Sequence, residues 1–155
     1  MVCVANGKRL SWLHFELRVS LTKDGRKEAT VRILIADDHP IVRAGLSELL
    51  ALQTNFEIVG EACDGREALD KVRRIVPDIL LLDLRMPHLD GLAVLEALQG
   101  SELHTRVVLL TAWADKFVFE RATKLGCCAM LPKHSDTDLI VECIRKVNAG
   151  QPWFG

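Results

Sequence analysis

The chain has 155 residues, 49% of them hydrophobic, which suits one domain with a substantial core and leaves little room for a second. Residues 1–30 carry six Lys/Arg and three acids, so residues 31–155, with fourteen and eighteen, have a net charge of −4 and no basic stripe for nucleic acid. No apolar run is long enough to cross a bilayer, and charged residues interrupt Leu13–Leu21, so no signal peptide is predicted. We therefore expect a cytoplasmic protein, whose five cysteines form no CxxC pair and serve as small core residues.

Residues 1–30 differ in pattern from the rest of the chain. Apolar and polar residues alternate over Leu13–Leu21, which predicts a half-buried strand, and Lys23-Asp24-Gly25 predicts a turn. One interpretation is an extra strand that joins a sheet edge or another chain. The other, which we favour, is a poorly ordered extension, because termini that are not tied down are usually mobile.

From Val31 onward, apolar strands alternate with amphipathic helices. The predicted strands lie at 31–36, 56–62, 79–83, 107–110 and 128–131, and the predicted helices at 40–50, 64–76, 92–98, 115–125 and 135–147. Such alternation is typical of an α/β fold with a doubly wound parallel sheet. Continuous apolar runs place strands one, three and four at the centre, which fits the flavodoxin-like order 2-1-3-4-5. Pro132 cannot donate to a ladder, so the fifth strand is expected at an edge.

Polar residues follow four of these strands where each strand ends: Asp37 and Asp38, Asp83, Thr111, and Lys133. In this topology they converge at the carboxyl edge of the sheet, around the switch point. Three neighbouring carboxylates repel one another unless a cation lies among them, and oxygen ligands at an open site suit Mg²⁺. Lys133 can balance a carboxylate or a phosphoryl group, and Thr111 can donate to a phosphoryl oxygen. The pattern predicts phosphoryl transfer with the Asp83 carboxylate as nucleophile.

Several separated motifs together resemble the receiver domain of two-component response regulators. They are Ile33–Arg43 with its Asp-Asp-His-Pro, Pro77–Pro87 followed by Asp90-Gly91, and the late Lys133. The Asp-Asp-His-Pro sequence and Val59–Ala62 are most similar to the NarL/FixJ class. The resemblance covers residues 31–150, and residues 151–155 are then expected to begin a linker.

The resemblance implies a CheY-like fold in which Asp83 accepts a phosphoryl group from the phosphohistidine of a sensor histidine kinase. It implies further roles by position: Mg²⁺ held by Asp37, Asp38, Asp83 and the backbone carbonyl of Arg85, a switch hydroxyl at Thr111, and a phosphate contact from Lys133. Such a protein is a signalling switch rather than an ordinary enzyme, although it can catalyse its own phosphorylation and dephosphorylation.

The chain departs from the family pattern at several positions. Met130 stands where the family usually has Tyr or Phe, three residues before the lysine. His134 follows the lysine where many receivers have proline, and Pro132 precedes it. Trp113, two residues after the switch hydroxyl, is expected over the site, where it would limit water access or simply pack on the next helix. His39, beside a helix-starting proline, is expected to be partly exposed at the helix start rather than at the metal.

NarL/FixJ proteins continue into a helix-turn-helix domain, and this chain stops at Gly155. We therefore expect DNA control only through a domain absent from this chain, with a homodimer on phosphorylation as an option and no membrane partner. The alternative is a stand-alone receiver that acts through protein contacts. Two other classes rank low: a haloacid-dehalogenase-type hydrolase needs Asp at position 85, which is Arg, and a flavin carrier needs a Ser/Thr/Gly-rich loop where the chain has Asp37-Asp38-His39.

Overall fold

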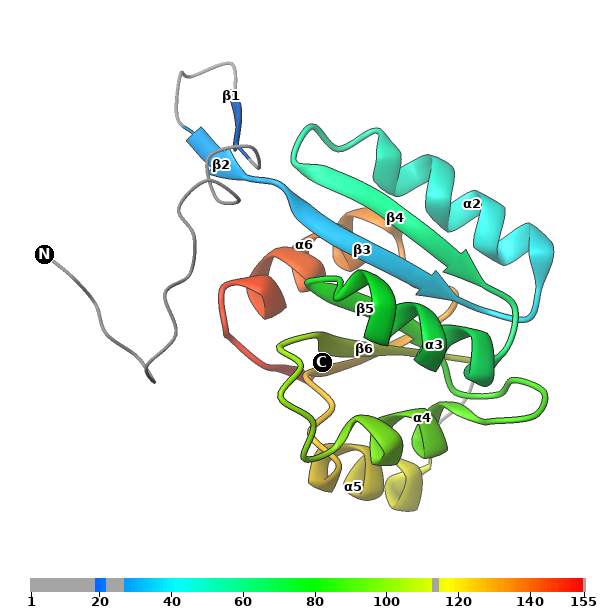
Figure 1. The fold of residues 1–155 in the computed structure, drawn as a ribbon. Coiled ribbons are helices and arrows are strands. Elements are labelled where there is room, and N and C mark those ends of the chain that lie inside the picture. Colours follow the sequence, from blue (N-terminus) through cyan, green and yellow to red (C-terminus); the bar gives the residue numbers. More distant parts are fainter. Residues whose placement is uncertain (1–18, 22–26, 113–114, 155) are drawn as a thin grey trace, which may run out of the picture.

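The computed structural model describes residues 19–21, 27–112 and 115–154. Its main sheet has six parallel strands in the order β4-β3-β5-β6-β7-β8. Figure 1 labels β4, β3, β5 and β6 of this sheet. The strands are β3 (Val31–Ala36), β4 (Phe56–Ala62), β5 (Ile79–Asp83), β6 (Arg106–Thr111), β7 (Ala129–Pro132) and β8 (Trp153–Phe154). The five predicted strands and their order 2-1-3-4-5 are confirmed, and β8 is an addition.

The prediction that the fifth strand lies at the sheet edge is wrong. β8 pairs with β7 in parallel, with Trp153 opposite Ala129 and Phe154 opposite Met130. The proline that suggested an edge, Pro132, lies beyond these two paired positions, so its missing N–H interrupts no bond to β8. The segment expected to begin a linker thus contains a short strand, which is too brief for any periodicity to reveal.

Helices cover both faces of the main sheet, as Figure 1 shows. They are α2 (Pro40–Ala51), α3 (Gly65–Ile75), α4 (Gly91–Leu98), α5 (Lys116–Lys124) and α6 (Thr137–Asn148). Side chains alternate along the strands, so Ile33 and Ile35 pack in one core with α2 and α6, while Leu34 packs in a second core with α3, α4 and α5. Because both faces are buried, the central strands are continuously apolar, which is the pattern that predicted them.

The starts of α2, α3, α4 and α5 agree with local sequence chemistry. Pro40 occupies the first turn of α2, where its missing N–H costs nothing. Asp64 and Asp90 cap α3 and α4, accepting hydrogen bonds of 2.9 Å from Glu67 N and 2.8 Å from Ala93 N. Asp115 caps α5 in the same way. These three caps fix where the loops before α3, α4 and α5 end.

The described part of the N-terminal region contains a two-stranded antiparallel sheet separate from the main sheet. β1 (Val19–Leu21) pairs antiparallel with β2 (Lys27–Ala29). Only the end of the strand predicted at Leu13–Leu21 falls within the described residues, and it pairs with β2 rather than with an edge of the main sheet. The predicted turn at Lys23–Gly25 lies outside them. Among the described helices, none has the length and apolarity needed to span a membrane.

Candidate functional site

The carboxyl ends of β3, β5, β6 and β7 bring the predicted polar residues to one edge of the sheet. Asp83 is the last residue of β5 and Thr111 the last of β6, while Asp37 and Lys133 directly follow β3 and β7. The side chains of Asp37, Asp83 and Thr111 are almost fully buried. Parallel strands necessarily gather such residues at the same edge, which is where open α/β sheets bind ligands.

Lys133 joins two of the carboxylates. Its Nζ lies 2.7 Å from Asp83 Oδ2 and 2.8 Å from Asp37 Oδ2. Burial lowers the pKa of Lys133, but its bonds to Asp37 and Asp83 outweigh burial, and the net pKa is raised. The ammonium group is therefore held protonated against both acids.

Both carboxylate oxygens of Asp83 accept a hydrogen bond. One oxygen, Oδ2, accepts a hydrogen bond from Lys133, and the other, Oδ1, accepts one of 3.2 Å from the Arg85 backbone N–H. Burial raises the pKa of Asp83, and the bonds from Lys133 and Arg85 oppose that rise only in part. The result is a poorly hydrated carboxylate whose orientation is fixed by two donors.

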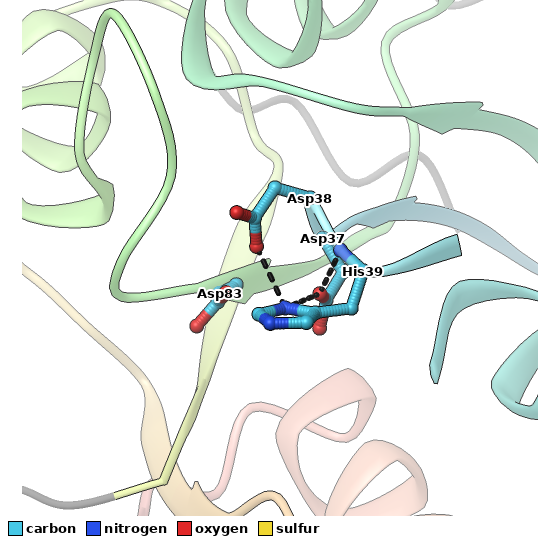
Figure 2. Close-up of side chains that lie close together, drawn as sticks. All are labelled: Asp37, Asp38, His39 and Asp83. Atoms are coloured by element: carbon cyan, nitrogen blue, oxygen red, sulfur yellow. Dashed lines mark hydrogen bonds and ion pairs between the residues drawn. The ribbon is translucent and has the colours of Figure 1, made fainter. Parts of the chain in front are cut away.

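The acidic cluster has the composition of a divalent-cation site. Asp37, Asp38, His39 and Asp83 each offer one ligand atom, and these atoms all lie within 4.8 Å of one another (Figure 2). Asp37 Oδ2 and Asp38 Oδ1 are buried, and each lies 2.8 Å from one ionisable neighbour, Lys133 Nζ and His39 Nδ1 respectively. The three carboxylates and Lys133 together carry a net charge of −2. Clustered carboxylate oxygens match the ligand preference of Mg²⁺, so the residues present fit a metal.

His39 lies closer to the acids than the sequence suggested. It is the N-cap residue of α2, and its side chain is 65% exposed, as expected of a helix start. Its Nδ1, however, lies 2.8 Å from Asp38 Oδ1 and 3.2 Å from Asp37 Oδ1 (Figure 2). The backbone N–H of His39 also donates to Asp37 Oδ1 at 2.9 Å, and this turn brings the ring back over the cluster.

Arg43 is a neighbour of the site that the sequence reasoning missed. Its guanidinium donates to the backbone carbonyl of Asp37 at 2.7 Å and to Glu61 Oε2 at 3.1 Å. It lies one helical turn after His39, whose carbonyl accepts the Arg43 N–H. That four-residue spacing is the signal that could have placed Arg43 beside the acids. It ties the loop that carries Asp37 to α2 and β4.

Two glycines bring the loop after β5 close to its neighbours. The Gly91 N–H donates to Leu84 O at 2.9 Å, and a Cβ on Gly91 would lie only 2.6 Å from the backbone oxygen of Asp83. A Cβ on Gly65 would overlap the carbonyl oxygen of Leu89. The Asp90-Gly91 motif thus has a structural reason: the aspartate caps α4, and the glycine lets that helix start against the backbone of Asp83.

The remaining candidate residues have different surroundings. The Thr111 carbonyl accepts the Lys133 N–H at 2.8 Å, so the ends of β6 and β7 are fastened together. Met130 is 9% exposed and packs in the core shared with α3, α4 and α5. Arg85 follows Asp83 by two residues, and the approach of its carbonyl to a metal stays a prediction. Trp113 lies outside the described residues.

Comparison with known proteins agrees with this arrangement. Residues 33–145 match the family model of the response regulator receiver domain. The chain is 39% identical over 114 residues to the probable transcriptional regulatory protein NarL of Mycobacterium tuberculosis, covering 74% of this chain and 53% of that protein. It is 31% identical over 125 residues to the response regulator protein VraR of Staphylococcus aureus, covering 81% and 60%. The chain therefore spans between half and two thirds of these curated relatives.

Solved structures give the same result. The signal receiver domain of the response regulator NarL from Mycobacterium tuberculosis superimposes with a TM-score of 0.76 at 37% identity, covering 79% of this chain and 98% of that one. A LuxR-family two-component response regulator from Aurantimonas superimposes with a TM-score of 0.75 at 30% identity, covering 80% and 89%. The fold, the acidic cluster at the carboxyl edge and these matches agree: the chain belongs to the response regulator receiver family, and its relatives are of the NarL/LuxR type.

Proposed function

We propose that Asp83 is the phosphoacceptor of this receiver and that its donor is the phosphohistidine of a sensor histidine kinase. The observation that carries the proposal is the buried Asp83 carboxylate, oriented by the Arg85 N–H and paired with Lys133 at 2.7 Å. A nucleophile needs a fixed approach to phosphorus, and the two donors supply it. The cation beside it can also balance charge on the transferring group.

In this mechanism an Asp83 oxygen attacks phosphorus as the phosphorus–nitrogen bond of the donor breaks, and the departing imidazole nitrogen takes up a proton. Lys133 exchanges part of its contact with Asp83 for a phosphoryl oxygen, and the Thr111 hydroxyl donates to another. Asp37, Asp38, Asp83 and the carbonyl of Arg85 would hold Mg²⁺. When bound, the ion offsets the charge of the carboxylates and of the phosphoryl oxygens.

Intact-mass measurement with acetyl phosphate tests the assignment. Wild-type protein should gain one phosphoryl group only when Mg²⁺ is present, because three carboxylates otherwise repel the donor. Asp83→Asn should gain none. Asp70→Asn, which changes an exposed acid on α3, is the matched control and should be labelled like wild type. Equal labelling of wild type and Asp83→Asn would exclude Asp83 as the acceptor.

The output we propose is control of transcription through a DNA-binding domain that this chain does not include. Support comes from the names of relatives such as NarL, of which the chain covers 53%. Sequencing the gene beyond the codon for Gly155 tests this, and a helix-turn-helix there is the expected result. A stop codon would favour the alternative, a stand-alone receiver that acts through protein contacts.

Two further parts of the proposal concern assembly and location. Phosphorylation is expected to promote a homodimer, which sedimentation velocity with and without beryllofluoride would detect. A cytoplasmic location is supported by the four described cysteines, all of which are free thiols as expected in a reducing compartment. Fractionation of cells that express the tagged full-length protein would test it.

A further inference from the structure

His39 adds a nitrogen donor to a cluster that otherwise offers only oxygen. We propose that His39 is an additional ligand of the divalent-cation site and makes this site prefer ions that favour imidazole, such as Ni²⁺, over Mg²⁺. The inference rests on the proposed function in so far as that function places a cation among Asp37, Asp38 and Asp83. It goes further in assigning a role to His39 and a selectivity to the site.

The donor separations fit a single ion. Two neighbouring ligands on a six-coordinate ion with bonds of about 2.1 Å lie about 3 Å apart, and two opposite ligands about 4.2 Å apart. His39 Nδ1 lies 2.8 Å from Asp38 Oδ1 and 3.2 Å from Asp37 Oδ1. One ligand atom from each of the four residues of the cluster lies within 4.8 Å of the other three. A common ion therefore requires only small movements of these side chains.

The two oxygens of Asp37 face different neighbours. Oδ2 contacts Lys133 at 2.8 Å, while Oδ1 lies toward the His39 ring at 3.2 Å. Asp38, which contacts His39, forms no ion pair with Lys133 among the described residues. The side of the cluster that His39 borders is thus the side where negative charge is least compensated. A cation bound there would have the imidazole as its neighbour.

The chemistry of the donors sets the selectivity. Carboxylate and carbonyl oxygens suit Mg²⁺, whereas imidazole suits Ni²⁺, Cu²⁺ and Zn²⁺, and affinity for a mixed nitrogen and oxygen site rises along the first row toward Cu²⁺. Ni²⁺ is the best probe, because thiolates compete more strongly for Zn²⁺ and Cu⁺ and the chain has free cysteines. His39 is also safe to replace: its side chain is 65% exposed and makes no capping hydrogen bond to α2.

Isothermal titration of tag-free protein with Ni²⁺ alone and with Mg²⁺ alone tests the proposal. His39→Ala should lower Ni²⁺ affinity at least tenfold and change Mg²⁺ affinity less than twofold. His39→Asn restores a polar group but offers an oxygen ligand, so it should not rescue Ni²⁺ binding. His104→Ala, an exposed histidine before the amino end of β6, is the control and should match wild type. Paramagnetic broadening of the His39 ring protons by Ni²⁺ is a second readout.

The outcomes separate cleanly. Unchanged Ni²⁺ affinity in His39→Ala overturns the assignment. An equal rise in the affinities of His39→Ala for Ni²⁺ and Mg²⁺ also overturns it, because His39 would then hinder metal binding rather than act as a ligand. Labelling of Asp83 with Mg²⁺ alone is measured in the same preparations and tests phosphotransfer independently. If Asp83 is not labelled while Ni²⁺ binding still depends on His39, the proposed function is wrong and the assignment of His39 as a ligand is supported.

Discussion

Gly91→Ala is the most informative perturbation of the site, because it adds one methyl group beside the backbone of the proposed phosphoacceptor. The new Cβ would lie 2.6 Å from Asp83 O and 3.0 Å from Leu84 Cα. Ordinary contact begins near 3.4 Å, so the end of β5 or the start of α4 must move by about 0.8 Å. Both neighbours are backbone atoms, and neither can turn away as a side chain would.

Two opposing effects determine how Gly91→Ala changes the free energy of unfolding. Overpacking costs about 1–3 kcal/mol, while loss of glycine's freedom in the unfolded chain returns about 0.5–1 kcal/mol. We expect a net loss of unfolding free energy of about 1–2 kcal/mol. A displacement approaching 1 Å at a reacting group costs up to about a hundredfold in rate, so phosphorylation of Asp83 should slow by about ten- to a hundredfold.

Urea unfolding and the rate of labelling by acetyl phosphate measure the two effects separately. Gly45→Ala on α2 is the matched control, because its Cβ would meet no described atom within 4 Å outside its own helix. It should gain about 0.5–1 kcal/mol in stability and keep the wild-type labelling rate. Wild-type stability and rate in Gly91→Ala would refute the reasoning. Lost stability with an unchanged rate would show that α4 yields and that Gly91 does not position Asp83.

Three further outcomes are expected. Met130 has several rotatable bonds, whereas the aromatic ring usual at this position has two stiff arrangements. The unphosphorylated protein should therefore sample both switch states, with a free-energy difference of about 1 kcal/mol between them. Relaxation-dispersion NMR that finds one rigid conformer would contradict this. The hydrogen bond from Lys71, aided by the Cys63 N–H, lowers the pKa of Glu67 from 4.5 to about 2, so its stabilisation is present above pH 4.5 and is lost as the pH falls toward 2. Glu67→Gln should therefore cost about 0.5–1 kcal/mol in urea unfolding at pH 7 and much less at pH 2, the partly exposed pair being screened by solvent; an equal cost at both pH values would exclude the ion pair. Residues 31–155, with a net charge of −4, should show no sequence-dependent DNA binding, and a salt-stable gel shift would contradict this.

Most of the fold could be predicted because its signals are local and repeated. The central strands are buried on both faces, so they are apolar without interruption, and each helix start carries a recognisable residue such as Pro40 or Asp64. β8 was not predicted, because a strand of two residues has no periodicity. Its pairing with β7 also depends on where the chain lies after the end of α6. The cysteines show the same limit. Cys127 and Cys143 are buried as predicted, whereas Cys63 is exposed, because it lies in a loop.

Part of the site could be predicted, because the carboxyl ends of parallel strands lie at the same edge of a sheet. Asp37, Asp83 and Lys133 needed only the strand order to be placed together. The contacts of His39 and Arg43 depend instead on the direction in which the chain turns after β3, and two adjacent residues of a turn can point to opposite sides. Side-chain orientation within a loop is set by tertiary contacts, which a sequence pattern of this length does not encode.

The two-residue strand β8 also bears on how the protein avoids unwanted self-association. A long open edge at β7 would present unpaired amides and carbonyls to a second molecule and could seed sheet-to-sheet aggregation. β8 occupies the positions opposite Ala129 and Met130, and Pro132 beyond them has no N–H to offer. The other edge strand, β4, has a register irregularity against β3 and carries an exposed charge at Glu57. Neither edge of the sheet therefore offers a long, regular strand for pairing. At high concentration a second molecule finds no edge along which its own strand could add continuously.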